Sequence, residues 1–105
     1  MSQTTRLSEV PVAARPYLAG GVRLRTDPVT GKPVLLYPEG VLILNPTGAA
    51  ILELCGGGRT VEQIASALAT RFAAPVDRIT EDVRQYVGCL RARRLLELQE
   101  EEDPG

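Results

Sequence analysis

The sequence predicts an α+β fold that is winged-helix-like, with a three-stranded antiparallel sheet followed by a three-helix bundle. Two observations predict it. Residues 22–44 consist of short apolar or alternating segments separated by turn residues, and residues 46–94 consist of segments with helical periodicity and cap residues. With 105 residues, the chain is long enough for one domain around a single core.

Three strands are expected in the first half of the chain. Val22–Thr26 alternates apolar and polar side chains, which is typical of a strand with one face in water. The segment DPVTGK has turn chemistry, so Pro33–Tyr37 is expected to return as the second strand of a hairpin. After the turn PEG, Val41–Leu44 is the third strand, and all four of its residues are apolar.

Three helices are expected in the second half. Asn45 is suited to cap the first helix, with Pro46 in the first helical position, and the glycine run 56–58 ends it. Thr60 and Gln63 form a capping box at the start of the second. The third runs from Asp77 to about Arg94. The apolar positions expected on one face of the second helix are Val61, Ile64, Ala65, Leu68 and Phe72, and those facing the core from the third are Ile79, Val83, Val87 and Leu90.

The two ends of the chain are expected to lie outside the domain, which spans residues 22–98. Residues 1–21 contain scattered apolar positions and prolines, and are interpreted as an extended N-terminal arm. Leu95–Leu98 is expected to end the fold as a packed turn or strand. Residues 99–105 form an acidic tail whose composition predicts disorder.

Composition excludes several classes of function. The net charge is −1, from 12 basic and 13 acidic residues, so no overall field favours nucleic acid or membrane. The chain has no histidine, and Cys55 and Cys89 are far apart and are interpreted as small buried thiols. We therefore expect no metal, no cofactor and no catalytic residues. No segment has the length and apolarity of a membrane span or signal sequence, which predicts a cytoplasmic protein.

The second and third helices could form a helix-turn-helix, so a winged-helix DNA-binding transcriptional regulator is the alternative function. The first half of a recognition helix faces base edges and phosphates. Here that half reads DRITED, which is net acidic and would repel phosphates. The charge pattern therefore disfavours this alternative.

The strand Val41–Leu44 carries neither a lysine nor a bulge, the usual protection of an exposed sheet edge. One explanation is that the edge receives a strand from a partner. The other is that a neighbouring helix or the N-terminal arm covers it. Both remain open at this point.

The segment VRLRTDPVTGKPVLLYPEGVLILNPTGAAILELCGGGRTVEQIASAL, followed by DV..YV..L..RRLLEL, resembles the PqqD family of peptide chaperones in pyrroloquinoline quinone (PQQ) biosynthesis. The resemblance covers roughly residues 15–98. Where the family commonly has Asp-Gly after ILELC, this chain has Gly56 and Gly57.

The resemblance implies a recognition element for a ribosomally synthesised and post-translationally modified peptide (RiPP). Such a module holds the precursor peptide PqqA and presents it to the radical-SAM enzyme PqqE, which supplies the iron–sulfur chemistry and cross-links a Glu and a Tyr of the peptide. In related modules the peptide adds as a strand beside the third strand and packs against the third helix. A homodimer formed by exchange of the arm or of a strand is also compatible with a free edge.

Carried over to this sequence, the resemblance places the peptide between the third strand and one flank of the third helix. The flank with Tyr86 and Cys89 is chosen because these side chains are apolar enough to line a groove; Thr80, Arg84 and Arg91 lie on the other flank. The expected peptide-binding residues are Val41, Leu42, Ile43, Leu44, Asp82, Gln85, Tyr86, Cys89 and Arg93.

Overall fold

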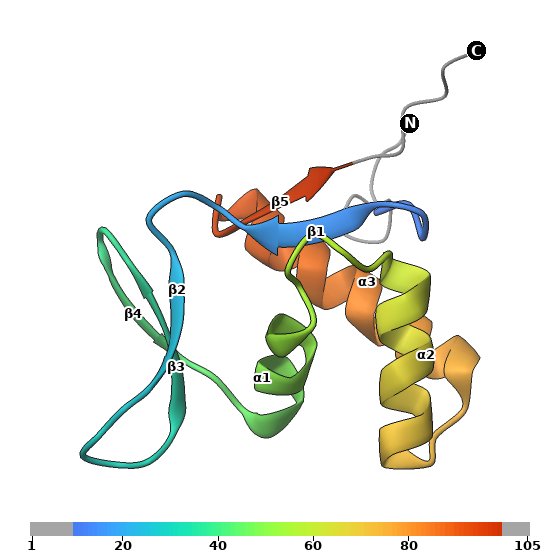
Figure 1. Cartoon of the computed structure of the whole chain (residues 1–105), viewed down its shortest axis with the longest axis horizontal. Coiled ribbons are helices and arrows are strands. Elements are labelled where there is room, and N and C mark those ends of the chain that lie inside the picture. The colour runs from blue at the N-terminus through green and yellow to red at the C-terminus, as the bar shows by residue number, and fades with distance from the viewer. Residues whose placement is uncertain (1–9, 100–105) are drawn as a thin grey trace, which may run out of the picture.

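A computed structural model describes residues 10–99 as two antiparallel sheets and three helices (Figure 1). The three predicted strands and the three predicted helices are present. The elements, in chain order, are β1 (Arg15–Leu18), β2 (Arg23–Thr26), β3 (Pro33–Tyr37), β4 (Gly40–Ile43), α1 (Pro46–Glu53), α2 (Val61–Phe72), α3 (Val76–Ala92) and β5 (Leu96–Gln99).

The three-stranded sheet has the order β2-β3-β4, so β4 is an edge strand. Leu35 of β3 pairs with Leu24 of β2 and with Leu42 of β4, which puts these three leucines in one row on one face. Leu35 is fully buried, so this face is the one that packs on the core. The sheet stands beside α1, at the end of the molecule away from α2 (Figure 1).

β1 and β5 form a second sheet, with Arg15 opposite Gln99 and Leu18 opposite Leu96. This corrects the expected arm and tail. Residues 10–21 belong to the folded domain, because β1 pairs inside it and Val10 and Ala14 are buried. The packed turn or strand expected at Leu95–Leu98 is the strand β5, which also includes Gln99 of the expected tail. Residues 1–9 and 100–105, the rest of the expected arm and tail, lie outside the described residues.

Local capping chemistry sets the starts of α1 and α2, as predicted. The Asn45 side chain accepts a hydrogen bond from the backbone N–H of Gly48 at 2.7 Å, and Pro46 occupies the first helical position. At α2, Gln63 N donates to the Thr60 hydroxyl at 3.1 Å, and Thr60 N donates to the Gln63 side chain at 2.9 Å. These caps fix where the chain turns from sheet to helix and from α1 to α2.

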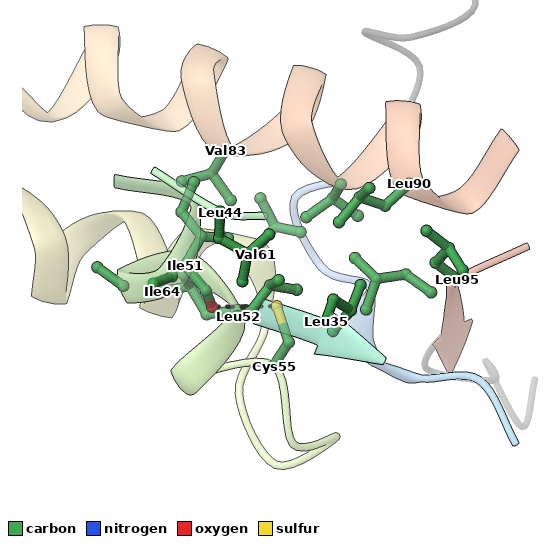
Figure 2. Close-up of a cluster of buried hydrophobic side chains, with 14 of the residues drawn as sticks. Leu35, Leu44, Ile51, Leu52, Cys55, Val61, Ile64, Val83, Leu90 and Leu95 are labelled. Atoms are coloured by element: carbon green, nitrogen blue, oxygen red, sulfur yellow. Dashed lines mark hydrogen bonds between the residues drawn. The ribbon is translucent and has the colours of Figure 1, made fainter. Parts of the chain in front are cut away.

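The core is aliphatic and lies between the three helices and the inner faces of the sheets. In Figure 2, Leu35 and Leu44 from the sheet side gather with helix residues such as Ile51 and Val83. Val61, Ile64, Ala65, Leu68, Val83, Val87 and Leu90 are all buried, as the helical periodicity predicted.

Two of the expected core residues are instead exposed. Phe72 is 42% exposed at the end of α2, where the Arg71 guanidinium lies 5.5 Å from its ring centre. Of the two thiols, Cys55 is buried and Cys89 is exposed. The expectation of two buried cysteines is therefore wrong for Cys89.

Candidate functional site

The side chains of β4 and of the residue after it alternate between two environments. Leu44 is buried and Leu42 packs against the core, whereas Val41 is 57% and Ile43 70% exposed. The predicted third strand is therefore apolar on both faces, but only its Leu42 and Leu44 face is covered. Two β-branched side chains remain open to solvent within the described part of the chain.

The backbone of β4 has one free edge. Leu44 N donates to Pro33 O at 3.1 Å, so residues 44 and 33 form a hydrogen-bonded pair of the ladder. In an antiparallel ladder such pairs alternate. The N–H and C=O groups of Leu42 and Leu44 therefore point toward β3, and those of Val41 and Ile43 point outward. Within residues 10–99, β4 pairs only with β3, and the two-stranded sheet lies elsewhere. The expectation that residues 10–21 could cover this edge is wrong.

A cleft of about 360 Å³ opens next to this strand, between α1 and α3. It begins at Asn45, two residues after β4 ends. The walls from the start of α1 are Asn45, Thr47, Gly48 and Ile51, and the walls from α3 are Asp82, Gln85, Tyr86 and Cys89. The base is apolar, since Ile51 is buried, while Asp82 and Gln85 on the rim are exposed.

Four of the five α3 residues expected to contact a peptide line the cleft: Asp82, Gln85, Tyr86 and Cys89. Arg93, the fifth, is the C-cap of α3 and is exposed; it does not line the cleft. The side chains of Val41–Leu44 do not line it either, so the two expected walls do not face each other across the cleft. The predicted site thus consists of a strand edge and a neighbouring cleft.

The other flank of α3 faces a different part of the molecule. The Arg84 side chain donates from Nε to the carbonyl oxygen of Val10 at 2.8 Å, which holds this flank against the chain that precedes β1. The Thr80 hydroxyl donates to Val76 O within the helix. The flank with Tyr86 and Cys89 is the one that borders the cleft.

Tyr86 is the central side chain of the cleft. Its ring is half-buried, and its hydroxyl group lies against the first turn of α1 at Gly48. Burial raises the pKa of Tyr86, and the negative charge that the neighbouring Cys55 and Cys89 sulfurs carry when ionised raises it further. At neutral pH the hydroxyl therefore stays protonated and can donate a hydrogen bond to a ligand in the cleft.

Sequence reasoning missed the wall formed by α1. Its signal was Gly48, a glycine inside a helix, where it costs stability unless a neighbour approaches closely. A Cβ on Gly48 would lie 2.8 Å from Cζ of Tyr86. The absence of a side chain at this position is what leaves room for the tyrosine.

The chemical groups around the cleft are suited to holding a ligand. They comprise a carboxylate, two amides, a threonine hydroxyl, a phenol and a thiol, on helices that are fixed by the core. Among residues 10–99, no three or more His, Cys, Asp or Glu residues gather as a metal site would require. No helix in the same range is long and apolar enough to cross a membrane.

Comparison with known proteins places this arrangement in a family. The family model described as coenzyme PQQ synthesis protein D (PqqD) matches residues 33–96, which include β3, β4 and all three helices. The chain belongs to the PqqD family. The resemblance of the sequence to this family is confirmed, and the comparisons give no support to a DNA-binding regulator.

Two relatives match over most of their length. The PqqA binding protein of Rhizobium meliloti (strain 1021) is 46% identical over 81 residues, covering 77% of this chain and 83% of the relative. The PqqA binding protein of Azotobacter vinelandii (strain DJ) is 40% identical over 98 residues, covering 93% of this chain and 99% of the relative.

A solved structure has the same fold. It is the solution NMR structure of the PqqD truncation of Methylobacterium extorquens PqqCD, described as a functional, stand-alone RiPP recognition element. The TM-score is 0.74 at 35% identity, with 89% of this chain and 99% of the other covered. The mixed architecture of antiparallel strands and three helices is thus that of a PqqD protein. The winged-helix description of the fold stays a prediction.

Proposed function

We propose that this PqqD-family chain is a non-catalytic peptide chaperone of PQQ biosynthesis. It binds the precursor peptide PqqA as an added strand on β4 and presents the peptide to the radical-SAM enzyme PqqE. The names of its relatives, PqqA binding proteins at 46% and 40% identity, support the peptide as the ligand.

The free edge of β4 is the observation that carries the mode of binding. The outward N–H and C=O groups of Val41 and Ile43 can form ladder hydrogen bonds with an extended peptide of almost any sequence. Strand pairing therefore supplies affinity, and side chains have to supply specificity.

The cleft between α1 and α3 supplies that specificity. A peptide side chain can place its apolar part against Ile51 and the ring of Tyr86, and polar groups against Asp82 and Gln85 on the rim. Arg93 lies one helical turn beyond Cys89, so it extends the same flank toward the end of α3. Arg93 therefore makes a peripheral contact with the peptide.

A titration of ¹⁵N-labelled protein with PqqA peptide tests this function. We expect the largest shift changes at residues 41–44 and on the flank of α3 from Asp82 to Arg93, with slower hydrogen exchange at the Val41 and Ile43 amides. A scrambled peptide of the same composition is the control. Unchanged amide exchange at residues 41–44, with shifts that gather instead on α2, would show that the peptide does not add to this strand.

A further inference from the structure

The three-stranded sheet has a second apolar face, on the side opposite the core. Val34 pairs with Ile43 and Leu36 pairs with Val41, so these four side chains share that side. Val41 and Ile43 are its most exposed members, at 57% and 70%. This surface is distinct from the cleft, because none of the four residues lines it.

Two arginines border this surface. Arg23 is opposite Leu36 and Arg25 is opposite Val34 in the β2–β3 register, so both side chains leave the sheet on the same side. Within residues 10–99 neither forms an ion pair. The carboxylate of Asp27, next along the chain, instead accepts hydrogen bonds from Val29 N and from the Thr30 hydroxyl, both at 3.0 Å.

The surface is hollowed rather than flat. A depression of about 380 Å³ lies between Arg25, Thr26, Asp27 and Pro28 on one side and Val34, Leu36 and Val41 on the other. Arg25 lines this depression, and Arg23 lies on the same side of the sheet. The Asp27 carboxylate also lines it, but is engaged by its own turn. Apolar side chains beside two arginines that form no ion pair within residues 10–99 are complementary to a protein surface that carries an apolar side chain next to Asp or Glu.

We propose that this open face, defined as Arg23, Arg25, Leu36, Val41 and Ile43, is the docking surface for the enzyme that receives the peptide. The inference rests on the proposed function, because it identifies where the second partner binds. A strand added to the free edge of β4 places every second side chain on this same face, beside Val41 and Ile43. The enzyme then contacts a surface made jointly by the chaperone and its peptide, which distinguishes the loaded chaperone from the empty one.

Charge reversal on β2 tests the open face. Arg23→Glu combined with Arg25→Glu changes the charge two strands away from the peptide edge. We expect labelled PqqA to bind this variant as it binds the wild-type chain, and PqqE to bind the peptide-loaded variant at least about tenfold more weakly. Leu36→Thr replaces an apolar side chain at the centre of the face by a polar, β-branched one that suits a strand. It is likewise expected to leave PqqA binding unchanged and to weaken PqqE binding. Arg91→Glu combined with Arg94→Glu makes the same charge change at the end of α3 and is the matched control.

The outcomes separate this inference from the proposed function. If PqqE binds the β2 variant and the wild-type chain equally, or if the α3 control shows the loss instead, the open face is not the docking surface. If the β2 variant differs from the wild-type chain only in how strongly it associates with itself, the face is a dimer contact and the inference is wrong. Equal affinity of PqqE for the empty and the loaded wild-type chain would refute the joint surface. If PqqA itself fails to bind, the proposed function fails, and binding of PqqE to the empty chain still tests the face.

Discussion

The hydroxyl group of Tyr86 on α3 occupies the space where a side chain on Gly48 of α1 would begin. Gly48→Ala is therefore expected to destabilise the protein by about 1–3 kcal/mol through overpacking. In a Tyr86→Ala background the same change should stabilise by roughly 0.5–1 kcal/mol, because alanine favours a helix more than glycine does. Urea unfolding of the four proteins measures this double-mutant cycle. An equal effect of Gly48→Ala in both backgrounds would refute the contact.

Tyr86→Ala is expected to weaken PqqA binding by about 1–2 kcal/mol, in the range of a well-packed interface contact, because the ring forms much of the cleft wall. Arg93→Ala should weaken binding less, since Arg93 lies at the C-cap of α3, outside the cleft. Titration calorimetry of PqqA into each variant and into the wild-type chain measures the two losses of affinity. Circular dichroism checks that each variant is folded. A larger loss with Arg93→Ala would move the site toward the end of the helix.

Proline substitutions in β4 distinguish its two hydrogen-bonding edges. Ile43→Pro removes an N–H that points to the free edge, so we expect a folded protein that no longer binds PqqA. Leu42→Pro removes an N–H that points to β3 and is expected to unfold the sheet. Ile43→Ala, which keeps the N–H, controls for loss of the side chain. Thermal unfolding and peptide titration of the three variants check both expectations. An unfolded Ile43→Pro variant would mean that the N–H of Ile43, rather than that of Leu42, points toward β3.

The two thiols should differ in reactivity. Cys89 is exposed at the cleft, while Cys55 is buried, donates a hydrogen bond to Ile51 O at 3.2 Å, and has its pKa raised to about 12 by burial. N-ethylmaleimide at neutral pH is expected to label one cysteine per native chain, and bound PqqA should slow that labelling. Mass spectrometry locates the adduct, with Cys89→Ser as the control. Labelling that PqqA leaves unchanged would place the peptide away from Cys89.

Stability should fall at alkaline pH, in part because of Cys55. Burial raises the pKa of Cys55 from an ordinary value of 9.0 to about 12, so the stability that its neutral thiol contributes is fully present below pH 9 and is lost as the pH rises toward 12. The slope from one such group is at most ~1.4 kcal/mol per pH unit. The raised pKa values of Tyr17 and Tyr86 act in the same direction. In Cys55→Ala only the two tyrosines should contribute to the loss of stability with rising pH. Urea unfolding of both proteins between pH 8 and 11 measures the difference. Equal slopes in both proteins would contradict this origin.

The sequence predicted the features that depend on neighbouring residues. Asn45 and Pro46 begin α1, and Thr60 with Gln63 begins α2, because capping bonds join residues only three positions apart. Helical spacing also fixes which α3 side chains share a face, and four residues of the chosen flank do line one cleft. Their contact with a peptide stays a prediction.

The features that the sequence did not predict depend on distant contacts. β1 was interpreted as part of an arm because its partner β5 is about 80 residues away, and the bond from the Tyr17 hydroxyl to Glu97 spans that distance. The α1 wall of the cleft was missed for the same reason: the approach of Tyr86 to Gly48 depends on how two helices pack. The exposure of Phe72, the last residue of α2, was missed for a similar reason. Helical periodicity does not show which other elements cover a given position.

The pairing of Arg15 with Gln99 brings the first and last strands of the described fold side by side, in a sheet that does not include β4. Such a topology admits circular permutation: a short linker can join these strands while new ends are opened in the β2–β3 turn, whose Thr30 and Gly31 are exposed. It also lets a longer polypeptide enter and leave the module at one place without crossing the strand edge.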